Sequence, residues 1–261
     1  MTTAILLGAL QGIAEWLPVS SEGLVTVAYS AMTDGNLLDA VHFALWLHLG
    51  TAFSALVAFK RDLQELFMEF WAEPTNPPRM IVVLTAITIV SAVIGFPLLL
   101  LLDFATSGLG VTVMVLIGVA MFITGLSQWK RRVMGDRVIS TFTWKDILLV
   151  GIVQGVSVLP GFSRSGLTVA VLLARRTNQR LALQISFLLS IPASLGAAFY
   201  VGIKGGFFGS LDGFIAGGVA FFVGLVVVKV LLKVVERVNF GILMMMIGVL
   251  IFAGSFWQIN L

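Results

Sequence analysis

The amino-acid sequence predicts an all-α polytopic membrane protein with six transmembrane helices and two re-entrant broken-helix hairpins, arranged as an inverted-topology repeat. Three observations predict this fold. The 261-residue chain is 59% apolar and only 11% charged, whereas a soluble domain has roughly 25% charged residues. Its basic residues are confined to a few segments, and one polar motif occurs twice.

Six apolar stretches are long enough to cross a bilayer, which takes about 20 helical residues. They are residues 41–59, 80–102, 109–129, 181–201, 211–232 and 240–257. Two further apolar stretches, 4–30 and 146–174, are interrupted near their middles by Pro, Gly, Ser and charged residues. Interrupted segments of this kind are typical of hairpins that enter a membrane and turn back.

The basic residues predict the sidedness of the chain. Fourteen of the 16 Lys and Arg residues lie in segments 60–79, 130–145, 175–180 and 229–239. The positive-inside rule places all four segments on the cytoplasmic face. The second and third of them share that face only if the stretch between them enters and leaves the membrane on one side. We therefore expect segment 146–174 to be re-entrant, with the C-terminus outside.

A repeated motif supports the same layout. QGIAEWLPVSSEGLVTV, which begins at Gln11, resembles QGVSVLPGFSRSGLTV, which begins at Gln154. In both, the Gly of the Gly-Leu pair, Gly23 or Gly166, lies 12 residues after the Gln. Three predicted spans follow each copy, so the second copy is expected upside down relative to the first. We predict a single membrane domain over 1–261, with repeat units of about 1–132 and 144–261. Chance similarity between small-residue motifs is the alternative for the repeat.

Three ionisable side chains lie inside the predicted hairpins, Glu15 and Glu22 in the first and Arg164 in the second. Charged groups are costly within a bilayer and are usually functional. If the hairpins meet, the two acids and the Arg share one polar cavity. The alternative is that Glu15 and Arg164 form a buried ion pair whose only role is to hold the hairpins together.

The second hairpin reads PGFSRSGLT over residues 160–168, and this composition suits a phosphate group. Gly161 permits close backbone approach, and Arg164 offers a planar fork that matches phosphate oxygens. Hydroxyl donors are supplied by Ser163, Ser165 and Thr168. The segment lacks the GxxxxGK[ST] pattern of a nucleotide P-loop. The other interpretation is a Gly/Ser turn with one snorkelling Arg.

The first hairpin combines an amide, a carboxylate and two hydroxyls. Gln11 and Glu15 lie four residues apart, on one helical face. Such a pair can hold a divalent cation, Mg²⁺ or Ca²⁺, whose other ligands are water and phosphate oxygens. Ser20 or Ser21, on the turn that follows, is placed to act as a nucleophile or as a phosphate donor. Alternatively, these hydroxyls satisfy backbone groups freed by the break in the helix.

The remaining reactive residue types are few. His42 and His48 lie six residues apart, which is neither a metal-ligand spacing nor one helical face. We interpret both as interfacial packing residues. The chain has no cysteine, which excludes a disulfide framework, a thiolate metal site and a Cys nucleophile.

Three motifs resemble those of the undecaprenyl pyrophosphate phosphatase family, the bacitracin-resistance type, and the resemblance covers nearly the whole chain. QGIAEWLPVSSEG at 11–23 resembles the family's [E/Q]xxxE-x-LP-x-SS element. LPGFSRSGLT at 159–168 resembles its PGxSRSxxT element, and ISFLLSIPA at 185–193 resembles part of the following span. The resemblance implies cation-dependent hydrolysis of a polyprenyl pyrophosphate to the monophosphate, at a site that opens to the outer face of the plasma membrane.

By position, the resemblance makes Gln11 and Glu15 the acidic-motif pair and Ser21 the nucleophile or its neighbour. It assigns phosphate binding to Ser163, Arg164, Ser165 and Thr168. The chain departs from the family's SSTGH pattern, because it has Glu22 and then Leu24 in place of a His associated with catalysis. Neither His42 nor His48 replaces this His by local spacing. We therefore expect proton transfer to fall to Glu15 or Glu22; the alternative is a relative with an altered substrate or activity.

The expected partners are a polyprenyl pyrophosphate, which the enzyme would recycle as a lipid carrier, and membrane lipid. No nucleic acid is expected, and the sequence leaves a homodimer open. The alternative function is a lipid-phosphate translocase or a small-molecule transporter, because inverted repeats with broken helices are equally a transporter layout.

Overall fold

The computed structural model describes residues 1–17, 19–106 and 135–234, together with Val119, Phe122, Leu126 and Val249. The side chains of Gln179 and of residues 103–106 and 232–234 are not described. Apart from Val119, Phe122, Leu126 and Val249, the predicted spans 109–129 and 240–257 lie outside the described residues.

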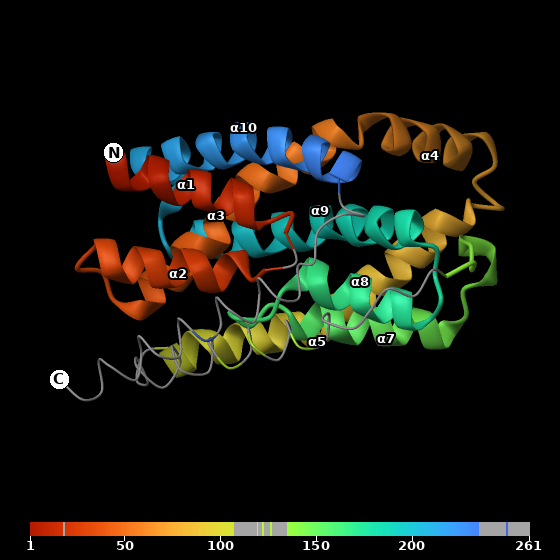
Figure 1. Ribbon diagram of the computed structural model, residues 1–261, viewed down its shortest axis with the longest axis horizontal. Coiled ribbons are helices and arrows are strands. Elements are labelled where there is room, and N and C mark those ends of the chain that lie inside the picture. Colours follow the sequence, from red (N-terminus) through yellow and green to blue (C-terminus); the bar gives the residue numbers. More distant parts are fainter. Residues whose placement is uncertain are drawn as a thin grey trace.

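The described ranges are built from helices, shown in Figure 1. The α-helices are α1 (Thr2–Ala14), α2 (Ser21–Met32), α3 (Leu37–Ala58), α4 (Lys60–Ala72), α5 (Arg79–Thr106), α7 (Trp144–Val156), α8 (Arg164–Ala174), α9 (Gln179–Lys204) and α10 (Leu211–Val234). Short 3-10 turns cover Ile139–Thr141 and Phe207–Gly209. The prediction of an all-α protein is thus confirmed for this part of the chain.

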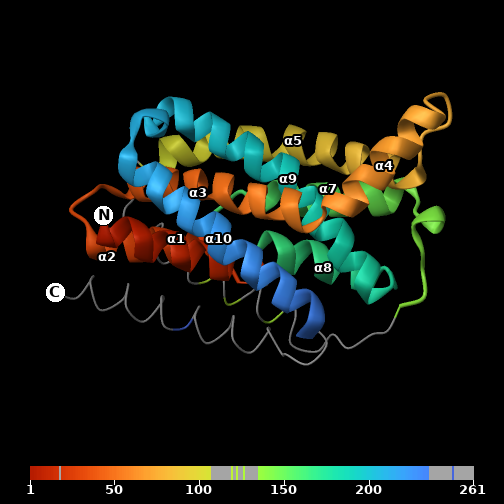
Figure 2. The ribbon, with the colours of Figure 1, turned by 90° about the horizontal axis from the view of Figure 1, so that it is seen from above.

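Four helical stretches are long and apolar enough to cross a bilayer. They are Leu37–Ala58, Arg79–Leu102, Arg180–Lys204 and Leu211–Leu231. Each coincides closely with a predicted span, so these four predictions are confirmed. In Figure 2 the helices that contain them extend along the long dimension of the molecule. The protein is therefore a polytopic integral membrane protein.

Both interrupted stretches fold as pairs of short helices. The first pair, α1 and α2, and the second pair, α7 and α8, occupy opposite ends of the helical bundle, and their breaks lie near its middle (Figures 1 and 2). The second helix of each pair begins on a serine cap. Ser20 Oγ accepts from the Gly23 N–H and Ser163 Oγ from the Gly166 N–H, both at 3.1 Å. The repeated motif thus adopts the same local structure twice, while the repeat boundaries stay a prediction.

Two glycines allow α10 to pack closely on the helices that carry the first hairpin and the span after it. A Cβ atom on Gly8 of α1 would lie 2.3 Å from the carbonyl oxygen of Ala216. One on Gly50 of α3 would lie 2.1 Å from the carbonyl oxygen of Gly217. Close backbone approach at small residues is the usual way in which membrane helices pack. It gives α1 and α3 a fixed relation to each other.

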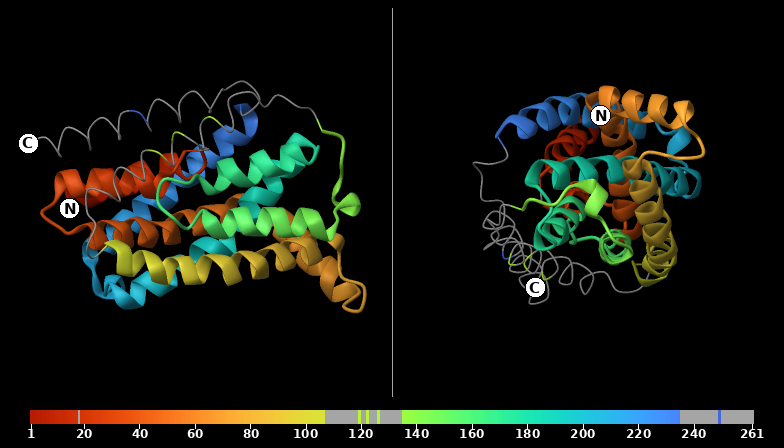
Figure 3. Two further views of the ribbon diagram at one scale, coloured as in Figure 1. Left: turned by 90° about the horizontal axis from the view of Figure 1, so that it is seen from below. Right: turned by 90° about the vertical axis from the view of Figure 1, so that its right-hand side faces the viewer.

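Three described segments that are rich in basic residues gather at one end of the molecule. These are residues 60–79, which include α4, residues 135–145, and residues 175–180 between α8 and the first turn of α9 (Figure 3). The grouping agrees with the predicted sidedness. The sequence predicts no helix in 60–79, which is too polar for a span, so helix α4 is an addition to the predicted fold. None of its residues is buried, and Phe67, Met68 and Trp71 are exposed, as in an amphipathic helix at a membrane surface.

A buried aspartate, Asp146 of α7, joins the loop before α7 to the end of α8. Asp146 accepts hydrogen bonds from Arg137 at 2.9 and 3.1 Å and from Arg175 Nε at 2.6 Å. It also accepts from the N–H and hydroxyl of Thr143, which caps α7. Burial alone would raise the pKa of Asp146, but the hydrogen bonds from Arg137, Thr143 and Arg175 outweigh it and hold that pKa below its ordinary value.

Replacing Asp146 by Asn is expected to lower the free energy of unfolding by about 3–5 kcal/mol, the usual loss when one partner of a buried ion pair is removed. Because the pKa of Asp146 is depressed in the folded state, its contribution is present above the unfolded pKa of about 3.9 and is lost as the pH falls through the folded value. Thermal unfolding in detergent measures the loss. Asp136→Asn is the control, because its exposed carboxylate lies 3.6 Å from Arg176. Equal stability of the two variants would contradict this account.

Candidate active site

The tips of the two hairpins meet in the middle of the molecule. Arg164, at the start of α8, donates through Nη2 to Oε1 of Glu15, which directly follows α1. The Gly161 N–H donates to Ser20 Oγ at 2.9 Å, and Ser165 Oγ donates to the Leu17 carbonyl oxygen at 3.1 Å. The prediction that an acid and the Arg converge is therefore confirmed.

The local sequence explains why both chains turn at this point. Helix α1 ends at Ala14, and the next helix starts only after Ser20, which acts as its N-cap. On the other hairpin, Gly161 has a φ of 99°, a conformation that glycine adopts without steric cost. That conformation directs the Gly161 N–H at the cap hydroxyl of the opposite hairpin. One serine thereby caps α2 and joins the two tips.

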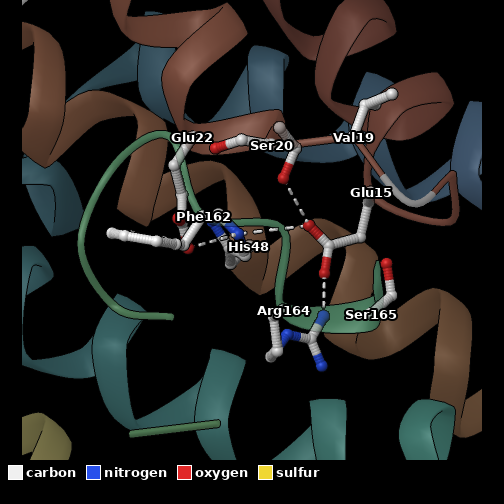
Figure 4. Close-up of a pocket in the computed structure, with 9 residues that line it drawn as sticks. Glu15, Val19, Ser20, Glu22, His48, Phe162, Arg164 and Ser165 are labelled. Carbon is white, nitrogen blue, oxygen red and sulfur yellow. Dashed lines mark hydrogen bonds and ion pairs between the residues drawn. The ribbon is translucent and has the colours of Figure 1, made fainter. Parts of the chain in front are cut away.

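Glu15 is the centre of the site and is buried. Its Oε2 accepts hydrogen bonds from Gln11 Nε2 and Ser21 Oγ, both at 2.9 Å. His48 Nε2 lies 3.1 Å from the same oxygen. Figure 4 shows the Glu15 carboxylate between His48 on one side and Arg164 on the other. A carboxylate held by this many donors is fixed in one orientation.

His48 reaches the site from α3, so its interpretation as an interfacial packing residue was wrong. Its Nε2 lies 3.4 Å from Oε1 of Glu22 as well, and its Nδ1 lies 2.9 Å from the carbonyl oxygen of Ala44. A carbonyl oxygen only accepts, so Nδ1 carries a proton. The contact of Nε2 with two carboxyl groups then requires a further proton, on Nε2 or on one carboxyl. His42 is buried on the same helix and does not line the pocket.

A small pocket lies between the hairpin tips. It is lined by Glu15, Val19, Ser20, Ser21, Glu22, His48, Phe162, Arg164 and Ser165. Its volume of about 10 Å³ is room for roughly one water molecule. A phosphate group would therefore enter only as lining side chains move. Each ionisable residue that the sequence singled out in the hairpins lies in this lining.

Three residues of the predicted phosphate cradle lie beside the pocket instead of in its lining. Ser163 Oγ caps α8. Thr168 Oγ1 donates to the Arg164 carbonyl oxygen at 2.8 Å and lies 2.6 Å from Ser186 Oγ on α9. The Gly161 N–H is directed at Ser20. Their side chains and backbone shape the cradle, and their contact with phosphate stays a prediction.

Two buried polar atoms near Glu15 have no hydrogen-bond partner within the described part of the chain, Arg164 Nη1 and Gln11 Oε1. An unpaired guanidinium N–H in the pocket lining suits a phosphate oxygen. Gln11 turns its Nε2 to Glu15 and leaves its oxygen without a partner among the described residues. An amide oxygen suits a hard divalent cation that takes most of its ligands from water and phosphate. No three His, Cys, Asp or Glu side chains in the described ranges form a metal site. The residues thus fit such a cation as a partial ligand set.

Comparisons with known proteins identify the family of the chain. Residues 4–250 match the family model described as bacitracin resistance protein BacA. An undecaprenyl-diphosphatase of Methanococcoides burtonii is 35% identical over 212 residues, 78% of this chain and 79% of the relative. Relatives with the same name share 40% identity in Haloarcula marismortui (78% of this chain, 77% of the relative) and 39% in Methanothrix thermoacetophila (74% and 72%). Since the match spans nearly the whole chain, including both hairpins, the protein belongs to the bacitracin resistance protein BacA family.

Proposed function

We propose that this protein hydrolyses a polyprenyl pyrophosphate, of the undecaprenyl type, to the polyprenyl monophosphate and inorganic phosphate, and so recycles the lipid carrier. The observation that carries the proposal is the buried Glu15 carboxylate, which accepts a hydrogen bond from Ser21 and lies against Arg164. A nucleophile, a base and a group that orients the base are the parts that covalent catalysis needs. The relatives are named undecaprenyl-diphosphatases, which favours hydrolysis over the alternative of lipid translocation.

The proposed reaction has two steps. Ser21 gives its hydroxyl proton to Glu15 and attacks the terminal phosphorus. The Ser21 O–P bond forms, the anhydride P–O bond breaks, and its electron pair leaves on the polyprenyl monophosphate. Water then attacks the phosphoserine while Glu22 takes its proton, the Ser21 O–P bond breaks, and Glu15 returns the first proton to the Ser21 oxygen. Glu22 passes its proton to the departing phosphate. Ser20, whose hydroxyl only accepts among the described residues, lines the same pocket and donates to the phosphate, and Nη1 of Arg164 stabilises its charge. Ser165 also lines the pocket and would donate to the phosphate in place of the Leu17 carbonyl oxygen.

We further propose that Gln11 and Glu15 hold a divalent cation, Mg²⁺ or Ca²⁺, together with oxygens of the substrate. A bound cation neutralises part of the pyrophosphate charge. Oε1 of Gln11, which no described residue contacts through a hydrogen bond, supports this assignment.

The test of the function is phosphate release from a C55 polyprenyl pyrophosphate by purified protein, with Mg²⁺, with Ca²⁺ and with a chelator. We expect release with a cation, little with the chelator, and none from a Ser21→Ala variant. A translocase would instead move the lipid across vesicles without releasing phosphate, and that outcome would refute the hydrolase.

For the membrane arrangement we propose six spans and two re-entrant hairpins in an inverted repeat, in the plasma membrane, with the site open to the outer face. The four confirmed spans and the two hairpins at opposite ends of the bundle support this arrangement. A homodimer is a further proposal, which the mass of the particle in detergent would test.

Single-cysteine labelling tests the sidedness, because the chain has no native cysteine. Arg180→Cys is expected to react only with permeant reagents, since the exposed Arg180 lies at the end where the basic segments gather. Gly209→Cys is the matched opposite, because a Cβ there meets no atom within 4 Å and residue 209 lies between α9 and α10. It is expected to react with impermeant reagents from outside. External labelling of Arg180→Cys would rule out a re-entrant second hairpin.

A further inference from the structure

His48 has no part in the steps described above, although it lies in the pocket lining and contacts both carboxyl groups. It is the one imidazole of that lining. It reaches the pocket from α3, a span that belongs to neither hairpin. The role of His48 is therefore not to join the two hairpin tips.

A backbone contact at Nδ1 orients the ring of His48. Its Nδ1 contacts the Ala44 carbonyl oxygen one helical turn earlier, at 2.9 Å. Helix α3 is itself wedged against α10 at Gly50, two residues after His48. These contacts fix the direction in which Nε2 points, and only 4% of the side chain is exposed.

The direction in which Nε2 of His48 points distinguishes the possible roles of this residue. A packing role explains a buried ring but not why its free nitrogen faces two carboxyl groups that line the pocket. A role in balancing charge is already filled for Glu15 by Arg164. Arg164, however, contacts Oε1 of Glu15, whereas His48 contacts Oε2, the oxygen that accepts from Ser21.

We propose that His48 is a positioning residue, which holds Oε2 of Glu15 against the Ser21 hydroxyl and keeps the Glu22 carboxyl apart from it. The inference rests on the proposed hydrolysis. Without the imidazole, two carboxyl groups would face each other in a medium of low dielectric constant, where like charges repel strongly. Glu15 would then turn towards both nitrogens of Arg164, which are ready for a two-pronged contact. Ser21 would lose its proton acceptor, and the phosphate would lose Nη1.

The test compares four proteins, wild type, His48→Leu, His48→Gln and His42→Leu, in the phosphate-release assay with C55 polyprenyl pyrophosphate. We expect kcat of His48→Leu to fall about 10²-fold, the scale of losing a working base, with KM changed by less than about threefold because the lipid contacts remain. His48→Gln keeps a side-chain N–H and should retain kcat within about tenfold of wild type. His42→Leu, the matched change on the same helix, should keep wild-type kcat.

Each result of this comparison either supports or overturns the positioning role of His48. Wild-type kcat in His48→Leu, or an equal loss in His42→Leu, overturns the positioning role. If kcat of His48→Gln is as low as that of His48→Leu, the positioning role is overturned too. A side-chain N–H would then not restore the activity. Thermal unfolding in detergent shows whether His48→Leu is folded, and if it is not, the comparison of His48→Gln with wild type decides alone. Failure of wild type to release phosphate would refute the hydrolase itself, and is read in the same assay.

Discussion

Phosphate release by a Glu15→Gln variant is expected to be at least about 10²-fold slower than by wild type, the usual loss when a general base is removed. The amide has nearly the same shape as the carboxylate but does not take the Ser21 proton. Its NH₂ group would also face one of the donors that now contact Glu15. Turnover is measured with the C55 substrate, and folding is checked by thermal unfolding in detergent.

Two comparisons identify the cause of the loss. Glu65→Gln makes the same chemical change on the exposed surface of α4 and should have wild-type turnover. Raising the Mg²⁺ concentration separates the two roles proposed for Glu15, because partial recovery indicates lost cation binding and no recovery indicates a lost base. Turnover within about threefold of wild type would remove Glu15 from the chemistry.

Arg164→Lys is expected to lose most of its activity, about 10²-fold in kcat/KM, although the charge is kept. In the structure Nη2 of Arg164 contacts Glu15, while Nη1 has no hydrogen-bond partner among the described residues. A guanidinium makes both contacts at once, whereas an ammonium is a point charge without that fixed fork. The measurement is again phosphate release, over a range of substrate concentrations.

Arg180→Lys is the control, because Arg180 is exposed in the first turn of α9. It should match wild type. If Arg164→Lys also matched wild type, Arg164 would act only as the counter-ion of Glu15, which was the structural alternative at the outset. That result would show that Arg164 does not bind the phosphate group.

Much of the fold follows from composition alone. The four confirmed spans are predictable because a bilayer requires a run of apolar residues of fixed length. The breaks near Glu15 and Arg164 are predictable because Pro, Gly, Ser and charge interrupt the apolar runs. Helix α4 was missed because its Asp and Glu residues make it too polar for a span, and its apolar side has helical spacing only over 13 residues.

The site was predictable where its residues belong to the two motifs, and not where a third element contributes. Spacing along one helix relates Gln11 to Glu15, but it says nothing about how α3 packs against the first hairpin. His48 was therefore excluded by a local rule, although the contact is tertiary. The signal that could have identified it is the one used for the acids, an ionisable side chain within a predicted span.

Because the active site is formed by both hairpin tips, it is completed only late in the synthesis of the chain. The guanidinium that contacts Glu15 is encoded 149 positions further along the chain. At 5–20 residues per second, a ribosome makes it roughly 7–30 s later. During that interval the first hairpin holds an acid without this partner, and no complete catalytic site exists. A nascent chain that stalls before the second hairpin therefore lacks Arg164 and is inactive.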